Sequence, residues 1–155
     1  MPDFKKDLLR GDKGESVIKK RYLCKKSKDL RYDLISAKGK TWEVKTDYYD
    51  MKKTPNFFIE KISNEEKNTL GGPWRAHKDG VEIFSYLYFK NRKHYIWEVD
   101  TLVEQLEKLV EGKEMTSVKN EYNGQLYYTL GYKIPRKLLE WSCFRVDVID
   151  ERFYK

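Results

Sequence analysis

The chain has 155 residues, of which 37% are charged and 15% are aromatic, including twelve Tyr and four Trp. It is too aromatic for a disordered chain and long enough for one core, so we expect one folded domain over residues 1–155. The net charge is +7, and residues 1–31 hold eleven Lys and Arg against five acids, which favours a polyanionic partner such as nucleic acid.

Cysteine usage and hydropathy exclude further classes of protein. Cys24 and Cys143 have no metal-ligand spacing and offer no disulfide framework, and no apolar signal segment opens the chain. We therefore expect an intracellular, reducing compartment, which includes a virus-encoded protein acting inside its host cell. The longest strongly apolar run, residues 83–89, is too short to span a bilayer, so no membrane association is expected.

The N-terminal region predicts a short amphipathic turn over residues 4–10, an interruption at Gly11, and a helix from about Asp12 to Lys26. Asp12 and Glu15 have the spacing of a capping box, which gives Glu15 a structural role. The opposite helix face is basic and can contact DNA phosphates, although a plain solvated face has the same composition. The lysines on it are Lys19, Lys20, Lys25 and Lys26.

Residues 31–47, RYDLISAKGKTWEVKTD, predict two short strands joined by a tight turn at residues 38–40. The second strand alternates between an apolar face and a charged face that carries Glu43 and Lys45. If the hairpin closes with Ala37 facing Thr41, Asp33 lies opposite Lys45 and diagonal to Glu43 on the same side of the sheet.

Two carboxylates beside an amine suit phosphodiester hydrolysis. The carboxylates can hold a hard divalent cation, Mg²⁺ or Mn²⁺, while the ammonium positions a water or stabilises charge on the phosphate. The backbone carbonyl of Val44 is a further candidate ligand. A solvated sheet face with cross-strand ion pairs explains the same three side chains, and on those residues alone it is the simpler interpretation.

The spacing of Asp33, nine residues, then Glu43-Val44-Lys45 resembles the core signature of the PD-(D/E)XK nuclease superfamily, with Tyr32 where the name-giving proline stands. The resemblance implies an α/β restriction-endonuclease-like fold, with a mixed central sheet flanked by helices. It implies that Asp33 and Glu43 are metal ligands and that Lys45 organises the attacking water. It also implies that Glu15, on the preceding helix, is an auxiliary carboxylate that reaches the metal directly or through water.

The next segment, from residue 55 onward, predicts a third, apolar strand over residues 57–62 with a central position. Glu60 interrupts it and is either at a polar edge or a further carboxylate of the site. A loop over residues 70–74 precedes one helical turn at residues 75–80, where Trp74 and Arg75 could touch substrate. The stretches KTPNFFIEKIS and GGPWRAHKDGVEIFSYLYF are similar to small phage nucleases and archaeal-type Holliday junction resolvases, which implies branched DNA as substrate and a homodimer.

The second half of the chain predicts structure without a catalytic pattern. A strand hairpin is expected over residues 81–99 and a helix with a capping box at Thr101 and Glu104 that stops at Gly112. A polar loop over residues 113–120, an Asn123-Gly124 turn and a strand over residues 126–134 follow. A short helix from Pro135 to Cys143 and a strand over residues 144–149 complete the chain.

Other chemistries find less support. His77 and His94 lack the spacing of a metal box, Gly71-Gly72 lacks the Lys of a phosphate loop, and Cys24 has no base partner. The sequence therefore favours a divalent-metal-dependent DNA endonuclease acting on branched DNA. A restriction-like nuclease for duplex DNA and a non-catalytic nucleic-acid-binding module are the alternatives.

Overall fold

The computed structural model describes the backbone of residues 4–155 and the side chains of residues 11–121 and 123–155. A six-stranded mixed sheet forms its centre, in which β3 and β6 are parallel and the other neighbours are antiparallel. The expected mixed sheet flanked by helices is thus confirmed. In spatial order the strands are β1 (Lys25–Lys26), β2 (Leu34–Ile35), β3 (Thr41–Asp47), β6 (Ile83–Tyr88), β7 (Lys93–Glu98) and β10 (Arg145–Val148).

A second, antiparallel sheet packs against the first. Its order is β5 (Thr69–Leu70), β4 (Asn56–Asn64), β9 (Gln125–Pro135) and β8 (Thr116–Tyr122). The strand expected over residues 57–62 exists as β4, but it lies inside this second sheet and not in the central one. The predicted loop over residues 113–120 was also wrong, because most of it is strand β8, which the Asn123-Gly124 turn joins to β9.

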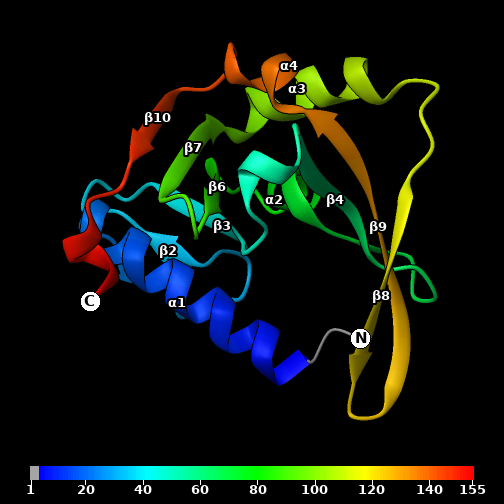
Figure 1. Ribbon diagram of the computed structural model, residues 1–155, viewed down its shortest axis with the longest axis horizontal. Helices are drawn as coiled ribbons and strands as arrows, with labels where there is room; N and C mark the ends of the chain where they lie inside the picture. The colour runs from blue at the N-terminus through cyan, green and yellow to red at the C-terminus, as the bar shows by residue number, and fades with distance from the viewer. Residues whose placement is uncertain (1–3) are drawn as a thin grey trace.

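The helices lie on both sides of the six-stranded sheet. Helix α1 (Phe4–Tyr22) covers one face, while α2 (Gly72–Lys78), α3 (Val99–Val110) and α4 (Arg136–Glu140) lie with the second sheet on the other (Figure 1). Two short 3-10 helices, η1 (Met51–Lys53) and η2 (Glu151–Tyr154), complete the elements. Among the described residues, no helix has both the length and the apolar character needed to cross a membrane.

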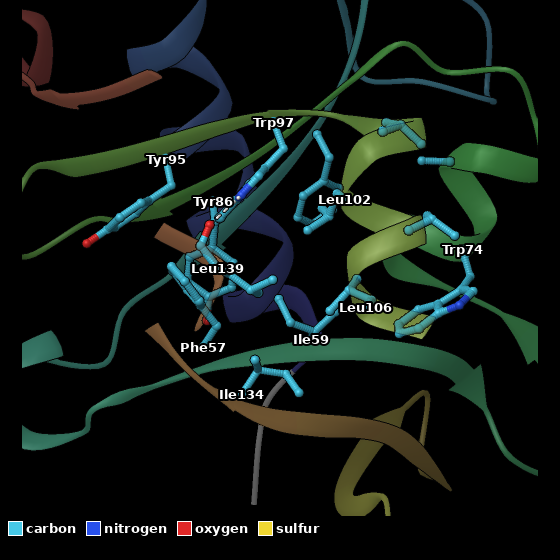
Figure 2. Packing of buried hydrophobic residues seen from close by; sticks show 14 of the residues in the cluster. Phe57, Ile59, Trp74, Tyr86, Tyr95, Trp97, Leu102, Leu106, Ile134 and Leu139 are labelled. Atoms are coloured by element: carbon cyan, nitrogen blue, oxygen red, sulfur yellow. Dashed lines mark hydrogen bonds between the residues drawn. The ribbon is translucent and has the colours of Figure 1, made fainter. Parts of the chain in front are cut away.

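The larger core fills the space between the two sheets and is rich in aromatic side chains (Figure 2). Phe57 of β4 meets the rings of Tyr95 and Trp97 edge to face, with centroids 4.9 and 5.4 Å away, an arrangement favoured by the ring quadrupoles. The indole Nε1 of Trp97 donates to the carbonyl of Leu139 at 3.1 Å, so its one polar atom is satisfied. This core fixes the second sheet against the charged face of β3.

Helix α1 differs from the prediction at both ends. It runs without a break through Gly11 and Asp12, so Asp12 is interior and the proposed capping box with Glu15 does not exist. The helix ends at Tyr22, where Leu23 adopts a left-handed conformation (φ 56°) and Cys24 N–H donates back to the Lys19 carbonyl. The chain beyond forms β1, so Lys25 and Lys26 are strand residues.

The register of the β2–β3 hairpin is also shifted from the prediction. Ser36 N–H donates to the Lys40 carbonyl, and Leu34 pairs with Trp42, so residues 37–39 form the loop. The loop ends on Gly39 because its φ of 84° suits glycine. Starting the loop one residue earlier moves the pairing by two, so Asp33 lies beside Glu43 and not opposite Lys45. A shift of two preserves which face each side chain occupies.

Candidate active site

The candidate site lies at an open edge of β3. Strand β2 is two residues long and pairs only with Trp42 and Thr41, so the rest of β3 extends beyond it. Asp33, just before β2, donates its N–H to the Trp42 carbonyl at 2.9 Å and accepts the Val44 N–H on its Oδ2 atom at 2.8 Å. These two bonds fix the Asp33 carboxylate beside Glu43. The Val44 carbonyl points to the same edge as its N–H, as required of a candidate ligand.

Four carboxyl groups from four segments interact here. Glu15 comes from α1, Asp33 precedes β2, Glu43 is on β3 and Glu60 is on β4. Glu15 and Asp33 share a carboxyl hydrogen bond, and the charge of Glu43 responds to Asp33, Glu15 and Glu60. The Oε2 atom of Glu60 lies against Gly71, at the start of α2. We name Glu15, Asp33, Glu43 and Glu60 the acid cluster.

The acid cluster is electrostatically unbalanced. Burial, and then the charge of Asp33, raise the pKa of Glu15 to about 7. The same two causes raise the pKa of Glu43 to about 8, with smaller contributions from Glu15 and Glu60. The pKa of Asp33 is also raised by burial, although the hydrogen bonds from Val44 and Glu15 oppose the rise. Near pH 7 the cluster therefore retains protons that a cation could replace.

Two basic side chains partly offset this charge. Lys26 on β1 lowers the pKa of Glu15 and Asp33, and Arg75 on α2 lowers the pKa of Asp33 and Glu43. Arg75 is also paired with Asp79 at 3.5 Å and its side chain is 52% exposed. The sequence suggested DNA contacts for both residues, and the structure brings both to the acid cluster. The sequence did not predict that these two cations would lie near the acids. Lys26 was expected on a helix and not on β1, and no local pattern connects Arg75 with residues 15–43.

Lys45 is two residues beyond Glu43 on the same face of β3, beside Tyr86 of β6, and is half-buried. Among the described residues its ammonium forms neither an ion pair nor a hydrogen bond. The cations that act most strongly on the acid cluster are Lys26 and Arg75. The structure therefore brings together Asp33, Glu43 and Glu15, adds Glu60, and leaves Lys45 adjacent to them along the strand.

Gly14 is a positioning residue that sequence analysis missed. A Cβ atom at Gly14 would come within 1.8 Å of the Thr46 Oγ1 atom, so only glycine allows α1 to approach β3 this closely. The neighbouring Glu15 thereby reaches the edge of the strand. Glycine at an interior helix position lowers helix stability by about 1 kcal/mol relative to alanine. A glycine within the predicted helix was therefore the sequence feature that could have indicated a close contact at this position.

The carboxylate and carbonyl oxygens of the site are suitable ligands for a hard divalent ion, but the carboxyl groups do not meet at one point. Carboxylate oxygens and a strand carbonyl are the ligands that Mg²⁺ and Mn²⁺ prefer. Within residues whose side chains are described, no three or more His, Cys, Asp and Glu side chains are grouped so as to hold a metal ion. The carboxyl groups of the acid cluster interact electrostatically, and Glu15 and Asp33 share a hydrogen bond.

The remaining candidates are distributed over the surface and the core. Lys19, Lys20 and Lys25 are exposed, and Lys20 Nζ donates to the Lys155 carbonyl at 2.9 Å. Trp74, expected to touch substrate, is instead buried in the core and donates to Glu107 at 2.7 Å. His77 pairs with Asp100 on the surface.

No protein-family model matches the chain, and no curated protein matches it in sequence. The functional interpretation therefore depends on the geometry and chemistry of the acid cluster.

Proposed function

We propose that the protein is a divalent-metal-dependent endonuclease that hydrolyses phosphodiester bonds in DNA. The observation that carries the proposal is the gathering of Glu15, Asp33 and Glu43 at the open edge of β3, where burial raises the pKa of all three and the charge of Asp33 further raises the pKa of Glu15 and Glu43. Such perturbed carboxyl groups are typical of functional sites. The arrangement fits the PD-(D/E)XK nuclease resemblance of the sequence.

Each residue has a distinct role in this proposal. Asp33, Glu43 and the Val44 carbonyl would hold Mg²⁺ or Mn²⁺, and Glu15 would contact it directly or through a water. The bound ion would supply positive charge for the phosphate and for the attacking water. Glu15 and Glu43 release their protons as the site loads, and Lys45 orients the water toward phosphorus. Glu60 adds negative charge behind Glu43.

The basic surface supports DNA as the substrate. Lys19, Lys20 and Lys25 are exposed at the end of α1 and on β1, the edge of the sheet nearest to Asp33. Contacts from lysines to phosphates position DNA without reading its sequence. We propose branched DNA as the preferred form and a homodimer as the active species.

A panel of DNA substrates tests the proposal. Supercoiled plasmid, single-stranded DNA and a four-way junction are incubated with Mg²⁺, with Mn²⁺ and with EDTA. We expect metal-dependent cutting that is fastest on the junction, whereas fastest cutting of the plasmid would indicate a restriction-like enzyme. The Asp33→Asn variant is the control for contaminating nuclease.

A non-catalytic nucleic-acid-binding module is the second candidate. The observation that favours it is the lack of convergence of the described carboxyl groups on one point. Tight, salt-dependent DNA binding without cutting of any substrate in either metal would select this alternative.

A further inference from the structure

Strand β10 is the outer edge of the six-stranded sheet, at the opposite end from β1, β2 and the acid cluster (Figure 1). Its apolar side chains face solvent: Phe144 is 66% exposed, Val146 42% and Val148 71%, and the nearby Trp141 is 70% exposed. Proteins usually protect an edge strand with charge, proline or a covering segment, and an exposed apolar edge is typical of a pairing surface.

The backbone of β10 is oriented for pairing with a further strand. Ile149 N–H donates to the Arg92 carbonyl at 2.7 Å, so the backbone groups of Ile149 point to the β7 side. Because successive residues alternate, Asp147 and Arg145 also point toward β7, whereas Val146 and Val148 point outward. Phe144 N–H breaks this alternation and donates to the Ile96 carbonyl of β7 at 2.7 Å, so Val146 and Val148 supply the outward backbone groups and Phe144 supplies only its side chain. The outward N–H and C=O groups of Val146 are at the middle of the exposed strand.

We propose that β10 pairs antiparallel with β10 of a second copy of this chain, about a two-fold axis at Val146. In this register Val146 faces its own counterpart, and Phe144 faces Val148 of the second copy. Arg145 and Asp147 pair within each chain, with Nε and Oδ2 2.8 Å apart, and in this register each Arg145 also faces Asp147 of the second copy, so the charges alternate in sign across the axis. Apolar side chains thus cover apolar side chains on one face, and ion pairs form on the other.

The charges select this register over its neighbours. Moving the axis one residue forward sets Asp147 against Asp147, and moving it one residue back sets Arg145 against Arg145. Like charges directly opposite each other on paired strands are destabilising. The sequence Arg145-Val146-Asp147 is therefore self-complementary only about Val146. A strand from an unrelated partner has no need of this symmetry, which is why a second copy is the occupant that we propose.

The pairing joins two six-stranded sheets into one of twelve strands. The two β3 strands are then seven strand spacings apart, roughly 34 Å at about 4.8 Å per spacing, with both acid clusters at the outer edges. This inference rests on β10 alone and does not depend on the proposed nuclease activity.

Sedimentation velocity over a range of concentrations tests the proposal. We expect the wild-type chain to dimerise and Val146→Lys to be monomeric, because two lysines would meet at the axis. Leu30→Lys, at another exposed apolar residue (93% exposed), is the matched control and should still dimerise. A wild-type chain that stays monomeric at every concentration overturns the proposal, and so does a Val146→Lys variant that dimerises like wild type.

Disulfide cross-linking tests the register in a Cys143→Ser background. Val146→Cys should form an intermolecular disulfide on mild oxidation, because directly hydrogen-bonded residues of antiparallel strands have Cα atoms about 5.5 Å apart, within disulfide range. Val148→Cys faces Phe144 of the second copy and should cross-link several-fold less. Equal cross-linking at both positions, or none at position 146, contradicts the two-fold register.

Discussion

Two polar clusters each include a side chain of helix α1 and lie near opposite ends of the six-stranded sheet, and they differ in electrostatic balance. In the acid cluster, Glu15 of α1 meets three other carboxyl groups. Two helical turns later, Tyr22 donates its hydroxyl proton to Asp147 at 2.5 Å, and its oxygen lies 2.9 Å from the Nδ1 atom of His94. Because the hydroxyl proton goes to Asp147, the Nδ1 atom of His94 is the donor to Tyr22.

In the second cluster, formed by Tyr22, His94, Arg145 and Asp147, the Asp147 carboxylate is matched by donors, and among the buried side-chain atoms of these described residues only the Nε2 atom of His94 is left without a hydrogen-bond partner. Burial would raise the pKa of Asp147, but the bonds from Tyr22 and Arg145 outweigh burial and lower it. Burial lowers the pKa of His94 to about 3, so this histidine is neutral. The acid cluster instead holds like charges that raise one another's pKa. A cluster in which a carboxylate is paired with donors stabilises the fold. A cluster of buried carboxyl groups that repel one another lowers the stability of the fold, and such clusters are typical of functional sites.

The largest difference between variants of the two clusters is expected in the rate of DNA cleavage. Asp33→Asn and Lys45→Ala should each lower metal-dependent DNA cleavage by roughly 10³-fold or more, because in the proposed mechanism the first removes a ligand of the divalent ion and the second removes the group that orients the water. Tyr22→Phe should leave the cleavage rate unchanged. Initial rates on the best substrate of the panel measure this, with melting curves to verify folding.

An exposed acid provides the control for charge. Glu66→Gln changes net charge equally but lies on the surface, so its rate should equal that of wild type. The Lys45→Ala variant should also retain much of its DNA binding. Undiminished cutting by both Asp33→Asn and Lys45→Ala would reject the assignment of the active site.

The dependence of stability on pH should reveal the raised pKa values of the acid cluster. Glu15 and Glu43 have a pKa of 4.5 when unperturbed and of about 7 and 8 in the folded chain, so the folded state binds their protons more tightly. The stabilisation of the folded state by these two bound protons is fully present below pH 4.5 and is lost as the pH rises through 7 and 8. Glu43→Gln should therefore raise the free energy of unfolding at pH 8 by roughly 1–3 kcal/mol.

Urea unfolding at pH 5.5 and pH 8 in EDTA measures this effect. Mg²⁺ should stabilise wild type at pH 8 by binding the folded state, and it should stabilise Glu43→Gln much less. A Glu43→Gln variant that is less stable than wild type at pH 8 would show that the carboxylate is not under repulsion.

Disrupting the cluster around Asp147 should change the free energy of unfolding in the opposite direction. Tyr22→Phe removes the donor to Asp147 and should lower the free energy of unfolding by roughly 1–2 kcal/mol, because a partly buried carboxylate loses its partner. Tyr49→Phe, at a tyrosine that is 60% exposed, is the control and should have little effect. Equal stability of Tyr22→Phe and wild type would remove the distinction between the two clusters.

The smallest expected effect concerns Arg75. Its side chain is half-exposed, so Arg75→Gln should lower the free energy of unfolding by about 0.5 kcal/mol at pH 8. The loss should be smaller at pH 5.5, where Glu43 is protonated. Lys78→Gln on the same helix is the control. A loss that is the same at both pH values would indicate that Arg75 does not act through the acid cluster.

Local patterns determined much of this protein. The alternation of β3 places Glu43 and Lys45 on one face, the apolar stripe of residues 102–110 forms α3, and the Asn123-Gly124 turn joins β8 to β9. These features depend on side-chain period and turn conformation, which a short segment specifies by itself. The same alternation also placed Asp33 and Glu43 on one side of the sheet, although as diagonal neighbours and not as the direct neighbours that the structure shows.

Tertiary structure decided which groups share the site. The left-handed Gly39 set the register that moved Asp33 from Lys45 to Glu43, and the close approach at Gly14 brought Glu15 to the edge of β3. The second sheet supplied Glu60 from β4. These contacts join segments far apart in the chain, and only their burial together converts ordinary carboxyl groups into a cluster whose pKa values are raised.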